Sequence, residues 1–130
     1  MTVTVDSVSS NTMADDLNEN SIGASHELRL YDSGDVLLAT LTYAASNGVV
    51  STSGGAEVIT YSEASYTDDE TPGNAGTVSY ATIRRTAATA REVVRFSDPS
   101  TELSLSSTTI ATNEPVRVTT DVVVKLPNST

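Results

Sequence analysis

The run of residues 116–126, bounded by Pro115 and Pro127, constrains the fold of this chain more than any other stretch. Its side chains alternate with a period of two, which is typical of a half-buried β-strand. The side expected to be buried holds Val116, Val118, Thr120, Val122, Val124 and Leu126. At roughly 3.3 Å per residue the strand would be about 36 Å long, so we expect it to pair with more than one neighbour. Because proline lacks the N–H group that a ladder needs, we expect pairing to stop at both prolines.

Length and the absence of cysteine limit how the chain can be stabilised. The 130 residues are enough for one domain with its own core, and without cysteine neither disulfide bonds nor zinc–thiolate sites are available. Residues 1–10 have neither a basic start nor a continuous apolar core, so we expect no secretory signal. No window approaches the ~20 apolar residues of a membrane span. We therefore expect a protein made and kept in the cytoplasm of the cell that produces it, with no membrane partner.

Charge is distributed unevenly along the chain. Residues 1–83 hold twelve acids and one base, a net charge of −11, whereas residues 84–130 hold six bases and five acids, a net charge of +1. An acidic chain without a basic patch repels nucleic acid, so we expect no direct nucleic-acid partner. Only one of the seven bases is Lys. The acidic surface has two open explanations, adaptation to high salt and ordinary solubility.

Alternating runs and turn residues predict about eight strands and at most one short helix. We expect the helix at residues 13–20, after Asn11 or Thr12 as its cap and before Gly23, with an acidic disordered segment as the alternative. Residues 2–8 are expected to form a further short strand or an extended arm. The strands are expected at residues 26–31, 36–43, 49–50, 56–62, 77–84, 90–96, 102–105 and 116–126.

The turns between these strands indicate the architecture. Residues 32–35 are expected to close a hairpin, residues 63–75 to form an exposed loop, and a bulge is expected near Ala81. Turns every eight to twelve residues are typical of a sandwich or barrel. We predict an all-β fold, an antiparallel β-sandwich at residues 26–127, with an N-terminal arm and the short helix at residues 1–25 and a tail at residues 128–130. With one Phe and no Trp, the core should consist of Val, Leu, Ile and Ala.

Few side chains offer chemistry for catalysis or metal binding. His26 is the sole imidazole, no nucleophile elbow surrounds any Ser, and we interpret His26 as a surface or hydrogen-bonded structural residue. The acids at residues 68–70, with Asp35 or Glu63, could offer oxygen ligands to Ca²⁺, but they match no known loop spacing, and a solvated loop is the simpler interpretation. We therefore expect no catalytic residue, no metal site, no cofactor and no enzymatic activity.

Two features are candidates for binding a partner. The only positive cluster brackets one predicted hairpin and consists of Arg84, Arg85, Arg91 and Arg95. These bases either pair with acids across the sheet or dock an acidic partner or the chain's own acidic N-terminal part. The second candidate is the extended arm, with the contact residues Thr2, Val3, Val5 and Val8. We select both because an unpaired arm and an isolated basic cluster are the least self-sufficient features of the chain.

Three segments together resemble a family of small proteins from tailed-phage structural modules. They are LLATLT at residues 37–42, GTVSYATI at residues 76–83, and the final run from VRVT at residues 116–119 to Pro127. In that family a LLATLT strand, a GTxxxxRI strand leading into a hairpin and a terminal VxVTxxxxxxP strand recur in this order. The resemblance covers residues 27–127. The chain departs from it at Thr82, where a base is frequent, in its acidic loop, and after Arg85, where the glycine-rich turn is missing.

The resemblance implies a head decoration, cement or minor capsid protein: a β-sandwich on the outside of an icosahedral head, with the major capsid protein as its partner. A receptor- or carbohydrate-binding module on a tail or fibre, and a head–tail connector subunit, are the alternatives. A cement protein needs no catalytic groups, only rigid sheets, protruding loops and extended ends that reach neighbouring subunits. Exposed edges and tails of this chain are available for strand addition. Because icosahedral shells present threefold junctions where one oligomer can hold several subunits, we also expect a homo-oligomer, with a trimer favoured.

Overall fold

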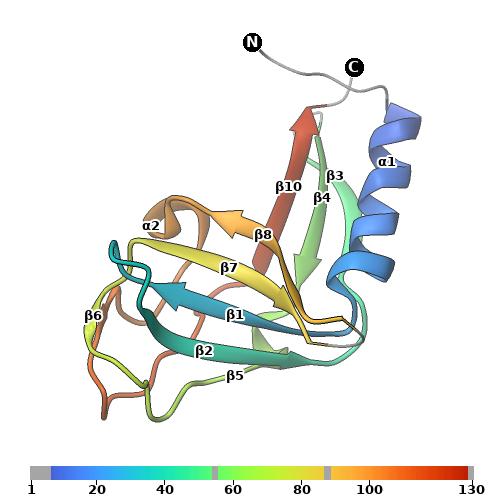
Figure 1. The fold of residues 1–130 in the computed structure, drawn as a ribbon. Helices are drawn as coiled ribbons and strands as arrows, with labels where there is room; N and C mark the ends of the chain where they lie inside the picture. The colour runs from blue at the N-terminus through green and yellow to red at the C-terminus, as the bar shows by residue number, and fades with distance from the viewer. Residues whose placement is uncertain (1–6, 54–55, 87–88, 129–130) are drawn as a thin grey trace.

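The computed structural model describes residues 7–53, 56–86 and 89–128, and this part of the chain forms ten strands in antiparallel sheets (Figure 1). The strands are β1 (Ser25–Tyr31), β2 (Leu37–Ala44), β3 (Val49–Ser53), β4 (Ala56–Tyr61), β5 (Tyr66–Thr67), β6 (Gly76–Thr77), β7 (Tyr80–Arg85), β8 (Arg91–Phe96), β9 (Thr109–Ile110) and β10 (Val122–Asn128). The helical segments are α1 (Ser7–Asp16), the π-helical turn η1 (Leu17–Ile22), the 3₁₀ turn η2 (Glu63–Ser65) and α2 (Pro99–Glu102). The predicted all-β, antiparallel class is confirmed.

Two sheets build most of the molecule. The larger has the strand order β5-β2-β1-β7-β8, the smaller has the order β10-β4-β3, and β6 pairs with β9 apart from both. Strands of the larger sheet run across Figure 1, whereas those of the smaller sheet stand nearly upright beside α1. One buried cluster includes Leu28 of the larger sheet, Ile59 and Val124 of the smaller sheet, and Ala14 of α1. The arrangement is therefore sandwich-like, with the helix packed onto a shared core.

The hairpin β1–β2 forms where alternation and turn residues predicted it. The two strands pair antiparallel with Leu28 opposite Leu41, and both side chains are buried. The side-chain oxygen Oδ1 of Asp32 accepts hydrogen bonds from the backbone N–H groups of Gly34 (2.8 Å) and Val36 (3.0 Å). A carboxylate that satisfies its own turn in this way stabilises a tight connection between the strands.

The helix is longer than the sequence indicated. Residues 7 and 8, predicted to be extended, lie in α1, and helical structure continues to Ile22. It ends at Gly23, which has a φ of 74°. The prediction that the helix ends before Gly23 is therefore confirmed. Many of these residues are polar and have modest helix propensity, and helices in proteins depend mainly on packing. The burial of Ala14 and Ile22 in the core supplies that packing.

The predicted single strand at residues 116–126 is wrong, although its alternation is right. Val116 bridges Asp69, Val118 bridges Leu105, and only β10 runs as a continuous strand, beside β4. Pairing with more than one neighbour is thus confirmed. The buried positions are Val116, Val118, Val122, Val124 and Leu126, whereas Thr120 is exposed. The chain breaks regular pairing at residues 119–121 because its successive partners belong to different segments.

Pairing also continues past Pro127, contrary to expectation. A register shift between Lys125 and Asn128 lets Asn128 pair with Ala56. β10 is an edge strand of its sheet, where a residue without an N–H group is tolerated at an irregularity. The proline therefore marks a bulge and not the end of the strand.

Three smaller expectations are corrected as well. Residues 63–75 are not simply an exposed loop, because Tyr66 is buried in β5, where an aromatic ring completes the core beside β2. The irregularity expected near Ala81 lies between Ile83 and Arg84, where β8 contributes one extra residue. Residues 102–105 do not form a strand, since a helical turn that begins with proline ends at Glu102.

Candidate binding surface

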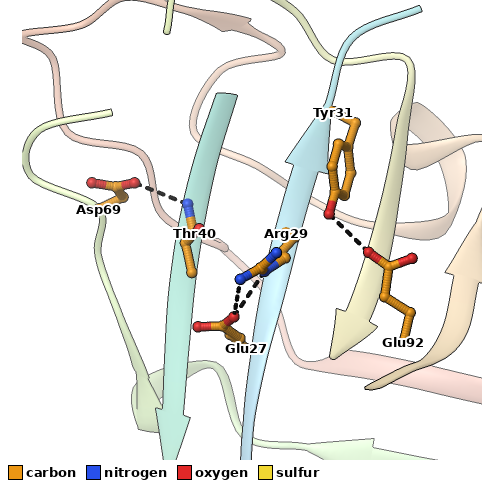
Figure 2. Close-up of polar contacts among 6 residues, drawn as sticks. All are labelled: Glu27, Arg29, Tyr31, Thr40, Asp69 and Glu92. Carbon is orange, nitrogen blue, oxygen red and sulfur yellow. Dashed lines mark hydrogen bonds and ion pairs between the residues drawn. The ribbon is translucent and has the colours of Figure 1, made fainter. Parts of the chain in front are cut away.

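The outer face of the larger sheet carries polar side chains that contact one another. Alternation along β1 buries His26, Leu28 and Leu30. Glu27, Arg29 and Tyr31 point to the other side of the strand, and Figure 2 shows these three side chains. The Arg29 guanidinium holds Glu27 Oε1, with Nε at 2.8 Å and Nη2 at 2.7 Å. We call the outward-facing surface of β1, β7 and β8 the outer face; it consists of Glu27, Arg29, Tyr31, Tyr80, Thr82, Arg84, Glu92 and Arg95.

An aromatic stack crosses the three strands of the outer face. The Tyr31 and Tyr80 rings are nearly parallel, at 8°, with centroids 4.9 Å apart, and Arg95 Cζ lies 4.0 Å from the Tyr80 centroid. Because β7 lies between β1 and β8, the two neighbours approach Tyr80 from opposite sides. Both ring faces of Tyr80 are therefore occupied, and a cation over an aromatic ring is attracted to it.

Hydrogen bonds hold both rings of the stack. The Tyr31 hydroxyl donates to Glu92 Oε1 at 2.8 Å, reaching across β7 (Figure 2). The Tyr80 hydroxyl donates to Asp35 Oδ1 at 2.7 Å, and this bond, with a smaller contribution from burial, raises the pKa of Tyr80 to about 12. The outer face is therefore organised before any partner arrives.

A depression on the outer face contains an unpartnered hydroxyl. It has a volume of about 180 Å³ and is lined by Tyr80, Thr82, Glu92, Val93, Val94 and Arg95. Thr82 is only 3% exposed, and its Oγ1 has no hydrogen-bond partner among the described residues. A buried hydroxyl without a partner costs about 1–3 kcal/mol of stability. The Oγ1 atom is itself buried from solvent, so a polar atom of a partner would reach it only after the side chains around the depression move.

The four predicted arginines lie on the neighbouring strands β7 and β8, but they differ in their surroundings. Arg95 is held on the Tyr80 ring, and Arg91 is exposed. Arg84 is half-buried on the outer face, in register with Glu27 of β1. Arg85 turns the other way, and its Nη1 donates to the backbone oxygen of Asn20 at 2.7 Å. One of the four thus ties β7 to the end of η1, and partner binding by the others stays a prediction.

The N-terminal candidate residues are only partly within the described structure. Thr2, Val3 and Val5 lie outside the described residues. Val8 lies in α1, so its backbone is helical and does not belong to an extended arm. The prediction that the arm binds a partner therefore concerns residues 1–6.

The sole histidine is a structural residue of the interior. His26 is fully buried, stacks on the Tyr43 ring at 4.4 Å, and its Nε2 lies 2.7 Å from the Tyr66 hydroxyl. Its Nδ1 lies 3.3 Å from the Gly23 carbonyl oxygen, which can only accept, so Nδ1 carries the proton and Nε2 accepts from Tyr66. Burial lowers the pKa of His26 to about 4, opposed in part by the Gly23 bond. The imidazole is therefore neutral at physiological pH.

Tyrosines share the core with the aliphatic residues, which corrects the expected core composition. Tyr43, Tyr61 and Tyr66 surround His26 and are at most 5% exposed; we call these four residues the aromatic cluster. The composition argument failed because a tyrosine ring can be buried when its hydroxyl finds a partner. Here Tyr43 donates to the Ser46 carbonyl oxygen at 2.7 Å.

A buried asparagine joins the helical segment to this cluster. The Asn18 side-chain oxygen accepts from the Gly48 N–H (2.9 Å) and the Tyr61 hydroxyl (3.0 Å), while its nitrogen donates to the Gly48 oxygen (2.7 Å). A Cβ at Gly48 would lie 2.8 Å from the Tyr61 ring and 2.9 Å from Ile59 Cγ2. The close approach that lets Asn18 hold both Gly48 groups therefore requires glycine.

The acidic loop has a structural role at Asp69. Its Oδ2 accepts from the Thr40 N–H at 2.9 Å (Figure 2), its Oδ1 accepts from the Thr71 N–H at 3.1 Å, and its backbone pairs with Val116. Among the described residues, no group of three or more acids, histidines or cysteines is placed to hold a metal ion. Asp69 thus fastens the loop to β2 and to the final segment.

The sequence did not indicate the roles of Tyr31, Tyr80 and Thr82 on the outer face. Alternation could have placed Tyr31 outward, because it follows Arg29 by two positions, and Tyr80 outward by its pairing with Tyr31. The buried hydroxyl of Thr82 had no comparable signal, because its burial depends on neighbours in β1 and β8.

Comparisons with known proteins complete the description. The chain matches no protein-family model, and no curated protein or solved structure is significantly similar to it. Within the described ranges, no helix combines the length and apolar character needed to cross a membrane.

Proposed function

We propose that this chain is a non-enzymatic virion structural protein that decorates or cements the outside of an icosahedral viral head, with the major capsid protein as its partner. The proposal is supported by the resemblance of residues 27–127 to tailed-phage head proteins and by the sandwich-like antiparallel fold. Such a protein needs rigid surfaces that contact its neighbours.

One observation carries the binding part of the proposal. The outer face presents an organised stack of Tyr31, Tyr80 and Arg95 beside a depression with the unpartnered Thr82 hydroxyl. Aromatic and Arg side chains are enriched where proteins bind one another, and groups held in place before binding lose less entropy. A polar group of the shell protein that reached Thr82 would remove the cost of its unpaired hydroxyl.

The interior position of His26 supports the non-enzymatic part of the proposal. A general base must reach the proton that it abstracts, and His26 is fully buried with both ring nitrogens occupied. The Tyr80 ring argues against the carbohydrate-binding alternative, because Tyr31 and Arg95 cover both of its faces. A stacking site for a sugar needs an open aromatic face.

The copy number in purified particles tests the proposed location. We expect quantitative mass spectrometry of the particles that contain this chain to find many copies, comparable with the shell protein. A few to a dozen copies would instead indicate a tail, fibre or connector component. Absence from the particles would refute all three structural roles.

The proposed trimer and the proposed arm contact need separate tests. Light scattering on the isolated protein should give a mass of about three chains if a symmetric trimer sits on the threefold junctions of the shell. Deletion of residues 1–6 should weaken binding to particles while leaving α1 complete. A monomer both in solution and on the particle would refute the trimer, and unchanged particle binding would refute the arm.

The basic cluster can be tested by charge neutralisation. Changing Arg84, Arg91 and Arg95 to Gln should weaken particle binding and reduce its dependence on salt, because the exposed bases are expected to meet acids of the partner. Arg117→Gln, which changes an exposed base elsewhere, is the matched control. Binding that is unchanged in strength and salt dependence would assign the hairpin to the sandwich alone.

A further inference from the structure

The two sheets leave a pair of strand edges beside one another. β8 is the last strand of the larger sheet and β10 is the last strand of the smaller sheet. Within the described residues, β8 pairs only with β7, and β10 pairs only with β4. Each strand therefore has one side whose backbone N–H and C=O groups are free to pair with an added strand.

A groove lies between these two edges. It has a volume of about 310 Å³, and its apolar walls are Val94 and Phe96 from β8 and Val123 and Val124 from β10. Val123 is 39% exposed, which is unusual for a large apolar side chain in this molecule. We call this space the edge groove. Residues of both edge strands line it, together with Glu102 of α2.

The register identifies which backbone groups face the edge groove. The Thr86 N–H bonds the Ser25 carbonyl oxygen, and β1 and β7 pair without a register shift, so even-numbered residues of β7 direct their N–H groups toward β1. The odd-numbered residues then face β8, and Phe96 and Val94 are their hydrogen-bonded partners. Arg95 therefore directs its N–H and C=O away from β7, toward the free edge.

Charge indicates what kind of strand would fit. The groove is flanked by Arg95 and Lys125, with Glu102 as its one acid. This lining is net positive in a chain whose total charge is −10. Neither base forms an ion pair with any described residue, since the single pair in this part of the structure joins Arg29 and Glu27. Acidic side chains on an incoming strand would complement both bases.

We propose that the edge groove receives an extended strand of a partner protein, with alternating apolar and acidic side chains. Alternate side chains of a strand point to opposite sides. Val123 and Lys125 lie on one side of β10 and Val124 lies on the other. One set would therefore pack against Val94 and Val124, and the other would lie beside Val123 and reach Arg95 and Lys125. The strand would bond the Arg95 backbone and join the two sheets. This inference rests on the proposed function in one respect, namely that the shell protein supplies the strand.

A synthetic peptide tests the chemistry of the occupant. The probe is a fluorescein-labelled octapeptide of alternating Val and Glu, titrated with the full chain by fluorescence anisotropy. We expect saturable binding, and at least tenfold weaker binding of the matching Val–Lys peptide. Failure of the Val–Glu peptide to bind, or equal binding of both peptides, would overturn the proposal.

Substitutions at Arg95 distinguish the contribution of its backbone N–H group to peptide binding from the contribution of its side chain. Arg95→Pro removes the N–H that faces the groove, without touching the ladder to β7, because proline is tolerated on the free side of an edge strand. We expect at least a tenfold loss of peptide affinity. Arg95→Gln keeps the N–H and should lose only a fewfold, whereas Arg117→Gln should bind as the parent does. If the Arg95→Pro variant binds the Val–Glu peptide as tightly as the parent does, strand addition at β8 is refuted.

A second variant keeps the test valid if Arg95→Pro does not fold. Val123→Glu places a carboxylate at an exposed position of the groove, so it should fold and should repel the acidic probe. We expect at least tenfold weaker binding, and unchanged binding would count against the groove. Hydrogen exchange should show new protection in β8 and β10 when the Val–Glu peptide binds, and protection confined to other strands would also overturn the proposal.

Two further outcomes separate this inference from its rivals. Concentration-dependent dimerisation that is lost in Arg95→Pro would make a second copy the occupant and would overturn the assignment to a partner. Peptide binding by a chain that is absent from particles would refute the proposed function while leaving the groove established. A chain that is present in particles at high copy number but does not bind the peptide would refute the groove proposal and leave the proposed function standing.

Discussion

The aromatic cluster, which packs between the two sheets, and the β8 edge of the larger sheet differ in how completely their polar groups are hydrogen-bonded. Around His26, both ring nitrogens have partners, and Asn18 bonds Gly48 and Tyr61 with both side-chain atoms. At the other end, Thr82 Oγ1 has no partner among the described residues, and the Arg95 backbone faces a groove. The polar groups named around His26 thus have partners within the chain, whereas Thr82 Oγ1 and the Arg95 backbone have none among the described residues.

This difference indicates where stability and binding are located. Buried polar groups with every bond made support one packed structure, and loss of one partner there is costly. Unpaired edges and buried hydroxyls without partners reduce stability, and a binding partner can remove the deficit. Substitutions should therefore destabilise the protein in the first region and alter binding in the second.

The largest effect on stability is expected at Asn18. Asn18→Ala removes three hydrogen bonds, leaving the Tyr61 hydroxyl unpaired in the interior and the partly buried Gly48 backbone without its side-chain partner. We expect a loss of about 3–4 kcal/mol in the free energy of unfolding, measured by urea titration. Asn20→Ala is the control, since Asn20 makes one exposed bond to Asp16, and should change stability by less than about 0.5 kcal/mol. A loss below about 1 kcal/mol at Asn18 would show that the closed network is not stabilising.

Acid should destabilise the aromatic cluster through His26. The folded state keeps the imidazole neutral down to a pKa of about 4, whereas the unfolded chain binds a proton near pH 6.5. The contribution of neutral His26 to the free energy of unfolding is therefore complete above pH 6.5. It is lost as the pH falls from 6.5 to about 4, and no further loss occurs below that pH. At about 1.4 kcal/mol per pH unit, the loss is about 3 kcal/mol.

The His26→Gln variant isolates this contribution. Its side chain does not titrate, so its stability should fall less steeply than that of the parent between pH 6.5 and pH 4. The stability difference between the two proteins should shrink by about 3 kcal/mol over that interval, measured by urea unfolding at each pH. Identical pH dependence in both proteins would exclude His26 as the titrating group.

A smaller effect, of opposite sign, is expected at Thr82. Thr82→Val removes the unpartnered hydroxyl from a side chain that is 3% exposed, so the free energy of unfolding should rise by about 1 kcal/mol. If the hydroxyl serves a partner, the same variant should bind particles more weakly, while Thr82→Ser should retain binding. Calorimetry and particle sedimentation measure the two effects. Lower stability in Thr82→Val would mean that the hydroxyl is already satisfied.

The fold was predictable where local pattern and tertiary contacts agree. The strand predicted at residues 26–31 forms, with Leu28 and Leu30 in the core, and the turn predicted at residues 32–35 closes the first hairpin. The final segment followed its alternation, yet its partners changed from Asp69 to Leu105 to β4, which no local pattern encodes. The length of the helical segment formed by α1 and η1 was underestimated because its stability comes from Ala14 of α1 and Ile22 of η1, which pack into the core.

The candidate surface was predictable only in part. The basic cluster was visible in the sequence, but the division between Arg85, which bonds Asn20, and Arg95, which covers Tyr80, depends on the face that each side chain occupies. The bulge between Ile83 and Arg84 adds one residue to β8, so it changes which residues of β8 lie opposite those of β7. The edge groove involves β8 and β10, which are brought together only by the packing of two sheets.

The smallest expected effects distinguish the arginines of the hairpin. Arg85→Gln should lower the free energy of unfolding by roughly 1 kcal/mol, because it weakens a charged bond to the carbonyl at the end of η1, where a cation is favourable. Arg91→Gln changes an exposed residue and should alter stability by less than about 0.5 kcal/mol. Parallel urea titrations decide between them. Equal losses in the two variants would mean that the bond from Arg85 to Asn20 does not stabilise the fold. Arg85 would then no longer be a structural contact between β7 and η1.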